Sequence, residues 1–295
     1  GIYSPEGQHY TPVDEGSLMS YREAVDGQIL QEGICETGAL ASFMAAGTAY
    51  AVHGVPTIPF YIFYSMFGFQ RVGDMIWACA DMMCRGFLLG GTAGRTTLNG
   101  EGLQHQDGHS LVLASTVPNL KSYDPAFGYE LAVIVRDGIH RMYEQDEKVF
   151  YYLTLYNENY PMPAMPTEDV TTGIIRGAYC WRRSDIKGEP VHLLASGSLM
   201  SQAISAAQSL EDKGIAAHIW SVTSYTELAR EAEDCERYNR SHPAEQPRVP
   251  CIESLFVDES GPIVAVTDYM KALPNSIASL DAGHLYNPGY RRFWS

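Results

Sequence analysis

The amino-acid sequence predicts an α/β protein with a mostly parallel sheet flanked by helices, organised as two domains. Short apolar, β-branched and aromatic runs alternate with longer helical stretches, which is the pattern of βαβ units. A proline-rich stretch at 160–166 interrupts this alternation, and such a stretch favours an extended linker. The length of 295 residues also suits two domains rather than one.

The first series of elements follows a polar, turn-rich lead-in over 1–27. Alanines and larger apolar residues occupy nearly every face of 36–53, which predicts a helix buried all round. The elements expected after it are a strand at 57–63, a helix at 69–84, a strand at 86–89, a loop at 90–109, a strand at 120–123, a helix from near 125 to 144 and a strand at 149–155.

The second series begins after the proline-rich stretch, so the domain boundary is expected near residue 166. Its expected elements are a strand at 191–195, a helix at 200–213, a strand at 216–221 and a helix at 225–234. The same alternation on both sides of the boundary indicates that both domains are of the α/β class.

Composition excludes several classes of protein. Lysine and arginine total 20 against 35 aspartates and glutamates, and the net charge of −15 disfavours nucleic acid or an anionic membrane surface as a partner. No window reaches the ~18 consecutive apolar residues of a membrane span. The chain starts with Gly1 rather than methionine, which indicates a processed chain or part of a longer one. Its first residues do not resemble a signal peptide, so a cytoplasmic location is the default.

The six cysteines form no C-x-x-C pair. Several of them lie in apolar or aromatic runs, so we interpret them as buried free thiols in a reducing compartment. The even count leaves disulfides as the alternative. No G-x-S-x-G motif is present, so the sequence gives no support to acyl-serine chemistry.

Two features in the predicted loop could carry chemistry. Residues 90–102 are glycine-rich and follow a strand, where α/β domains place ligand-binding groups, but a Walker lysine is missing. His105 and His109 lie four residues apart with Asp107 between them. They could ligate zinc if helical, act as polar or acid–base groups in a loop, or simply lie at the surface.

A carboxylate and an aromatic cluster stand out earlier in the chain. Glu36 begins the first predicted helix amid apolar residues, so it is either a first-turn glutamate favoured by the helix dipole or a buried functional carboxylate. The aromatic cluster can form core or a ring-stacking wall. Its members are Tyr61, Phe63, Tyr64, Phe67 and Phe69.

Four segments in this order resemble one family. They are QILQEGICE at 28–36, IPFYIFYSMFGFQR at 58–71, GTAGRTTLNGEGLQH at 91–105 and NENYPMP at 157–163. Together they closely resemble the homodimeric, bacterial-type pyruvate dehydrogenase decarboxylating component, a thiamine-diphosphate enzyme of the transketolase superfamily. The resemblance extends from Gly1 to about Ile277.

The resemblance implies a site built between two subunits. An amino-terminal domain of one subunit would hold the cofactor's diphosphate and a divalent metal, usually Mg²⁺. The middle domain of the other subunit would hold the aminopyrimidine, and a carboxy-terminal domain would complete the homodimer. The resemblance therefore implies a thiamine-diphosphate-binding fold followed by a partial transketolase-like carboxy-terminal domain.

The resemblance also gives roles to individual residues. Glu36 matches the glutamate that hydrogen-bonds the aminopyrimidine ring nitrogen and so activates the cofactor, and Ile34 matches the bulky residue that holds the cofactor bent. Tyr64 and Phe67 match the aromatic wall at the pyrimidine, with Tyr64 also near the substrate.

Two further residues match the substrate pocket. His105 matches an active-site histidine that contacts the substrate-derived intermediate, and Asp14 matches an aspartate that reaches the same pocket. The implied activity is oxidative decarboxylation of pyruvate, with transfer of the acetyl group to the lipoyl group of a dihydrolipoyl acetyltransferase partner. The alternative is another 2-oxo acid dehydrogenase or a transketolase-type enzyme on the same fold.

The chain departs from the family at both ends. It lacks the amino-terminal domain, where the diphosphate and metal ligands are expected, and the opening of the middle domain. The segment DYMKALP at 268–274 still matches, whereas the tail at 280–295 does not. We therefore expect a middle domain over 1–166, a partial carboxy-terminal domain over 167–279, and an isolated chain that is a non-catalytic fragment.

Overall fold

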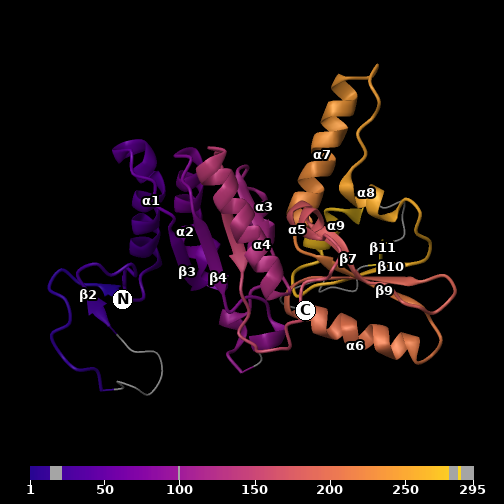
Figure 1. Cartoon of the computed structure of the whole chain (residues 1–295), viewed down its shortest axis with the longest axis horizontal. Helices are drawn as coiled ribbons and strands as arrows, with labels where there is room; N and C mark the ends of the chain where they lie inside the picture. The colour runs from indigo at the N-terminus through magenta and orange to yellow at the C-terminus, as the bar shows by residue number, and fades with distance from the viewer. Residues whose placement is uncertain (14–21, 99, 279–284, 287–295) are drawn as a thin grey trace.

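The computed structural model describes residues 1–13, 22–98, 100–278 and 285–286. It contains two larger sheets, each flanked by helices, and we call the parts built on them the N-terminal lobe and the C-terminal lobe. The two lobes lie side by side, with the N-terminal elements in indigo to magenta and the C-terminal elements in orange to yellow (Figure 1). No helix in the described ranges is long and apolar enough to cross a lipid bilayer.

The N-terminal lobe is built on a four-stranded sheet in the order β3-β4-β6-β5, with all pairs parallel. Its strands are β3 (Phe60–Tyr64), β4 (Phe87–Gly91), β5 (Leu120–Tyr123) and β6 (Phe150–Thr154). Its helices are α1 (Glu36–His53), α2 (Ser65–Asp81), α3 (Ser110–Ser115) and α4 (Gly128–Ile139), which continues as a π-helical turn over His140–Glu144. A small parallel pair, β1 (Ile2–Tyr3) and β2 (Glu23–Ala24), precedes the lobe.

The C-terminal lobe is built on a sheet in the order β11-β10-β8-β9-β7, in which only the β7–β9 pair is antiparallel. Its strands are β7 (Ala178–Arg182), β8 (Val191–Ala195), β9 (Ala217–Val222), β10 (Ile263–Val266) and β11 (Leu285–Tyr286). Its helices are α5 (Thr171–Arg176), α6 (Met200–Glu211), α7 (Tyr225–Ser241), α8 (Cys251–Phe256) and α9 (Ala272–Asn275). The predicted α/β class with mostly parallel sheets is confirmed.

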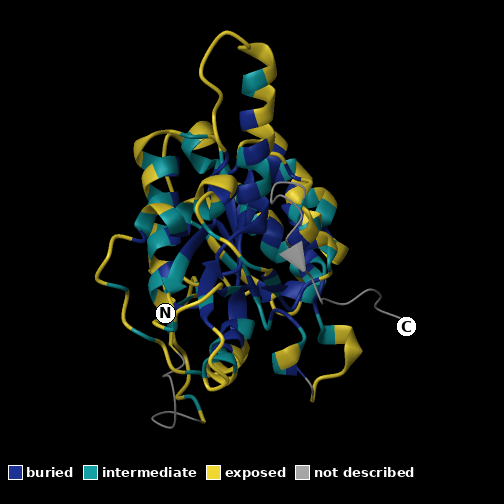
Figure 2. Ribbon diagram, turned by 90° about the vertical axis from the view of Figure 1, so that its right-hand side faces the viewer, coloured by how far each residue is buried: buried dark blue, intermediate teal, exposed yellow. Residues whose placement is uncertain are grey.

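Helix α1 has the bounds that the sequence predicts, but the prediction that it is buried all round is wrong. Only Leu40, Phe43 and Gly47 are buried in this helix, because α1 packs against α2 and β3 on one side. Composition reveals that a helix is apolar around its circumference but does not reveal which surfaces cover it. In Figure 2 the dark blue buried residues gather at the two sheets, whereas the helices carry teal and yellow faces.

Helix α7 is longer than expected and projects from the body of the molecule (Figure 1). Its start is set by Ser224, whose side chain accepts a hydrogen bond from the backbone N–H of Glu227. Beyond Asp234 the helix is charged on its surface and is supported by ion pairs at helical spacing, such as Arg240 with Glu236. This end has no apolar stripe, which explains why periodicity places the helix end too early.

A shared core joins the two lobes. One cluster of buried side chains extends from Leu40 and Phe150 in the first lobe to Trp220 and Leu228 in the second. Polar contacts cross the same boundary: Oγ of Ser224 donates to the carbonyl of Ser122 at 2.6 Å. The lobes are therefore packed as one body rather than as beads on a linker.

Candidate functional site

Three rings form a cluster where β3 runs into α2. Tyr64 is the last residue of β3, Phe67 lies in the first turn of α2, and His105 belongs to the 3₁₀ turn Leu103–His105. The ring centroids of Tyr64 and Phe67 are 5.9 Å apart, and the His105 ring lies 5.5 Å from Tyr64 and 5.4 Å from Phe67. We call these three side chains the ring cluster. Tyr64 is 47% exposed, so the cluster is open to solvent on one side.

Glu36 is joined to the ring cluster through Arg71. Nη1 of Arg71 lies 2.6 Å from Oε1 of Glu36, and the Arg71 guanidinium lies 4.1 Å from the centroid of the Phe67 ring. Glu36 stands at the first position of α1, where the helix dipole favours a carboxylate. Its side chain is 18% exposed, so the carboxylate is partly buried and keeps contact with water and with a cationic partner.

Tyr61 on β3 contacts the backbone of Glu36. Its hydroxyl donates to the backbone carbonyl of Glu36 at 3.4 Å. Burial, with a smaller contribution from the nearby charge of Glu36, raises the pKa of Tyr61 to about 12. Tyr61 therefore stays protonated and acts as a hydrogen-bond donor to the backbone at the start of α1.

Ile34 is not brought into this arrangement. Ile34 is 99% exposed on the segment before α1, so it makes no core contact. Asp14 lies outside the described residues. Cys35, between Ile34 and Glu36, is exposed, and its sulfur accepts a hydrogen bond from the backbone N–H of Gly38.

The two histidines of the loop face different partners. Nδ1 of His105 is 3.1 Å from the carbonyl of Glu101, and its ring belongs to the ring cluster. His109 instead pairs with Gln70 on α2. Asp107 is fully buried and accepts from the backbone N–H of Ser110, so it holds the start of α3. Within the described ranges no three His, Cys, Asp or Glu side chains are arranged to hold a metal ion.

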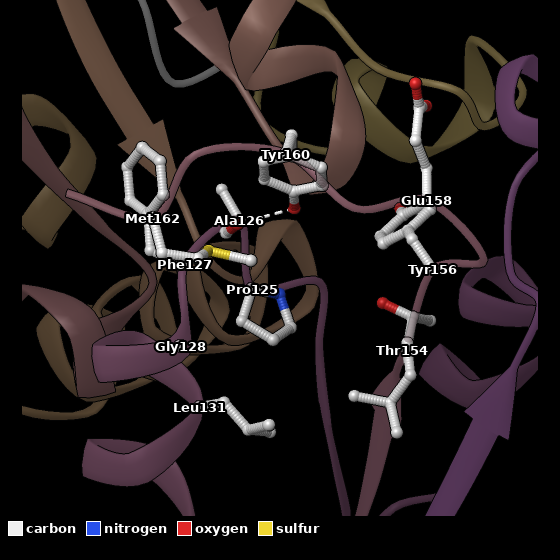
Figure 3. Close-up of a pocket in the computed structure, with 11 residues that line it drawn as sticks. Pro125, Ala126, Phe127, Gly128, Leu131, Thr154, Tyr156, Glu158, Tyr160 and Met162 are labelled. Atoms are coloured by element: carbon white, nitrogen blue, oxygen red, sulfur yellow. Dashed lines mark hydrogen bonds between the residues drawn. The ribbon is translucent and has the colours of Figure 1, made fainter. Parts of the chain in front are cut away.

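A separate small cavity of about 160 Å³ lies between the start of α4 and the proline-rich stretch and includes none of the ring cluster. Pro125 and Phe127 line it together with Tyr160 and Met162 of the proline-rich stretch (Figure 3). The Tyr160 hydroxyl donates to the carbonyl of Ala126 at 2.6 Å. This bond fastens the start of the linker to the N-terminal lobe.

Sequence reasoning missed Arg71 and Asp268. Arg71 is the last residue of the matching segment 58–71, and Asp268 opens the matching segment 268–274. Asp268 lies after β10 in the C-terminal lobe, yet its side chain accepts hydrogen bonds from the glycine-rich loop of the other lobe. An exposed arginine on a helix and an aspartate in a turn give no signal in composition or periodicity, so only their positions inside matching segments could have indicated them.

Sequence comparisons give consistent relatives. The chain is 54% identical over 279 residues to the pyruvate dehydrogenase E1 component of Escherichia coli strain K12 and 52% identical over 281 residues to that of Pseudomonas aeruginosa. Each match covers 94% of this chain but only 31% and 32% of the relative. The chain thus spans about a third of the length of these relatives.

Solved structures show the same fold at low identity. A transketolase from Leishmania mexicana is similar with a TM-score of 0.65 at 18% identity, covering 91% of this chain and 34% of that one. A split gene transketolase described as an inactive beta4 tetramer gives 0.60 at 16% identity, covering 100% of this chain and 82% of that one.

Family models divide the chain in the same order as the two lobes. The transketolase-like C-terminal domain matches residues 177–290. The middle domain of the pyruvate dehydrogenase E1 component matches residues 1–163, more than half of the chain. The chain therefore belongs to the pyruvate dehydrogenase E1 component family, of which it carries the middle domain and a transketolase-like C-terminal domain.

Proposed function

We propose that this chain supplies the aminopyrimidine half of a thiamine-diphosphate site in a pyruvate dehydrogenase. The full-length protein would decarboxylate pyruvate oxidatively and transfer the acetyl group to the lipoyl group of a dihydrolipoyl acetyltransferase. The single observation that carries the proposal is the connection of Glu36 to the ring cluster through Arg71. The E1 relatives that share half of the residues support it.

The contacts of Arg71 support the fit of a planar heteroaromatic ring. Its guanidinium is flat, bears N–H donors, and lies both on the Phe67 ring and against the Glu36 carboxylate. An aminopyrimidine is also flat and also makes N–H bonds. The Arg71 side chain is 49% exposed, so it has room to move aside into solvent. The residues present thus suit the group.

Each side chain would then have one task. Glu36 would hold a proton at Oε1 against the ring nitrogen, and Arg71 would leave that oxygen. Phe67 and Tyr64 would form the wall that orients the ring, and His105 would contact the substrate-derived part of the pocket. Thiamine diphosphate supplies an electron sink for decarboxylation when bound, and the protein's part is to bind and orient it.

Two further residues belong to the proposal, Ile34 and Asp14. We assign Ile34 to the bend of the cofactor, since its exposed side chain is free to pack against a bound group. Asp14 is assigned to the substrate pocket. The proposed domains are 1–166 and 167–279, with 280–295 as a separate tail.

The remainder of the site would come from outside this chain. Ligands for Mg²⁺ and for the diphosphate would lie in an amino-terminal domain, and a second copy of the full-length protein would complete a homodimer. We therefore propose that the isolated chain is non-catalytic, and that the full-length protein works in the cytoplasm. Calorimetry with thiamine diphosphate and Mg²⁺ should show no saturable binding to the isolated chain, and tight binding would refute this point.

The assignment of Glu36 is tested in the full-length protein. Glu36→Gln should abolish thiamine-dependent decarboxylation of pyruvate, because the amide cannot supply a proton at that oxygen. Glu32→Gln is a matched control, since Glu32 is a nearby exposed carboxylate that bonds to Ser42 rather than to Arg71. Near-normal turnover in Glu36→Gln would contradict the proposed function.

A further inference from the structure

The glycine-rich loop leaves the N-terminal lobe through a narrow neck. The backbone N–H of Asp107 donates to the carbonyl of Gly94 at 2.9 Å, which closes residues 95–106 into one excursion. This excursion carries both 3₁₀ turns and ends close to His105. Gly94 has φ of +75°, a left-handed conformation that glycine adopts without strain.

Asp268 of the C-terminal lobe binds the segment where the chain enters this neck. Oδ2 of Asp268 accepts from the backbone N–H groups of Arg95 at 2.9 Å and Thr96 at 3.0 Å, and Oδ1 accepts from the Thr96 hydroxyl at 2.5 Å. The Arg95 guanidinium donates in return to the backbone carbonyl of Asp268, from Nε at 3.0 Å and Nη2 at 2.8 Å. Asp268 is only 7% exposed, so water competes little for these bonds.

The segment where the chain leaves the neck is bound by Met270, two residues after Asp268. The backbone N–H of Met270 donates to the carbonyl of Gly108 at 2.8 Å. Residues 268–270 therefore hold both segments of the neck. Asp268 binds residues 95–96, which follow Gly94, and Met270 binds Gly108, which follows Asp107. We call this set of contacts the neck clamp.

Within the excursion, His105 makes one contact inside the loop and ring contacts with residues outside it. Its Nδ1 faces the carbonyl of Glu101, a residue of the same excursion, so this contact moves with the loop and cannot fix it. Its ring lies against Tyr64 and Phe67, which belong to β3 and α2. The placement of His105 over those rings therefore depends on where the neck is held.

We propose that Asp268 is a positioning residue of the site, through which the C-terminal lobe sets the position of His105 in the ring cluster. The role of His105 towards substrate rests on the proposed function, whereas its position is measured independently of any ligand. The alternative is that Asp268 only joins the lobes. That role would affect stability without moving His105.

Two substitutions in the 295-residue chain separate these roles. Asp268→Asn keeps one oxygen to accept from the two backbone N–H groups and can turn its amide towards the Thr96 hydroxyl. Asp268→Ala removes every acceptor of the side chain. Lys121→Met is the matched control, because the Lys121–Glu227 ion pair also bridges the lobes but does not touch the loop.

The readout is the ring resonance of His105 in proton–carbon NMR, assigned with His105→Gln. Packing against two aromatic rings shifts this resonance from its position in the unfolded chain. Asp268→Ala should move it most of the way back, Asp268→Asn should retain most of the shift, and Lys121→Met should leave it unchanged. Tryptic cleavage between Arg95 and Thr96 should become about tenfold faster in Asp268→Ala only.

An unchanged His105 resonance in folded Asp268→Ala would overturn the proposal, as would equal loss in the Asn and Ala variants. Should Asp268→Ala fail to fold, Thr96→Val removes only the Oδ1 contact and should give a smaller shift in the same direction; no shift would again overturn the proposal. If the full-length protein does not bind thiamine diphosphate while these shifts occur, the proposed function fails and the neck clamp stands.

Discussion

Nη1 of Arg71 lies 2.6 Å from Oε1 of Glu36, so α2 holds the carboxylate at the start of α1. Arg71 is half exposed, and an ion pair of this kind contributes little to stability because water screens it. The pair can therefore break at small cost. Arg71 can therefore pair with the Glu36 carboxylate and still leave it when another group binds there.

We expect Arg71→Met to change the free energy of unfolding by less than about 1 kcal/mol. Methionine keeps apolar contact with Phe67 while removing the charge, so packing of the side chain is largely retained. Urea denaturation of the chain measures the change, with Arg237→Met in the exposed pair with Asp234 as control. A loss of several kcal/mol would mean that the pair is a structural bond rather than an exchangeable one.

Parts of the fold follow closely from local pattern. The helix at 36–53 and the strands at 120–123 and 191–195 have the predicted bounds. Helix α2 begins at Ser65 instead of near residue 69. Gly68 is the reason: a Cβ there would lie 2.1 Å from the Phe63 ring, so this glycine serves close packing rather than a helix break.

The site is predictable only in part. Motif resemblance indicates Glu36, Tyr64, Phe67 and His105, and the structure places the three rings together with Glu36 one side chain away. Arg71 is missed because an exposed arginine on an amphipathic helix has no distinguishing local pattern. The burial of α1 is predicted wrongly because composition does not reveal which surfaces pack against a helix.

A buried carboxylate at the lobe boundary predicts an effect of pH. Asp124 accepts from the hydroxyls of Thr154, Tyr156 and Ser196, and burial is the largest cause that raises its pKa, to about 6, against the lowering effect of those donors. Because the folded-state pKa exceeds the unfolded value of 3.8, the folded chain binds this proton more tightly. Its contribution to the free energy of unfolding therefore falls as pH rises from about 4 to about 6.

We expect Asp124→Asn to flatten this dependence. The difference between the two pKa values corresponds to a loss of about 3 kcal/mol in the free energy of unfolding across that range. The neutral amide of asparagine does not titrate, so the variant should not show this loss. Urea denaturation of both proteins from pH 4 to 7 gives the free energy of unfolding as a function of pH, and the slopes of the two curves are compared. A loss of stability that is the same at every pH leaves the slope unchanged and does not affect the comparison. Parallel curves for the two proteins would show that Asp124 does not titrate in this range.

The packing of the neck predicts that two glycine substitutions in the loop will differ in their effect on stability. A Cβ on Gly94 would lie 2.5 Å from Oδ2 of Asp268 and 2.9 Å from the Tyr156 ring, on a backbone with φ of +75°. Gly94→Ala should therefore lower the free energy of unfolding by about 1–3 kcal/mol. Gly100→Ala, in the same loop with open space around it, should lower it far less. Equal losses measured by urea denaturation would contradict the described neck.

Cysteine reactivity tests the exposure of the site directly. Of the six thiols, Cys35 is exposed beside Glu36, whereas Cys79, Cys84, Cys235 and Cys251 are buried. Cys180 is partly buried, and burial raises the pKa of its thiol to about 11. At pH 8 the thiolate is therefore scarce at Cys180, and the four buried thiols are sheltered from reagent.

We expect a chromogenic disulfide reagent to label one thiol rapidly in the native chain and all six in denaturant. Cys35→Ser should remove the rapid phase, and Cys180→Ser should leave it intact. In the full-length protein, thiamine diphosphate with Mg²⁺ should slow labelling of Cys35, because the bound group would lie against Glu36, the next residue. Rapid labelling that persists in Cys35→Ser would place the accessible thiol elsewhere, and labelling indifferent to the cofactor would separate Cys35 from the proposed site.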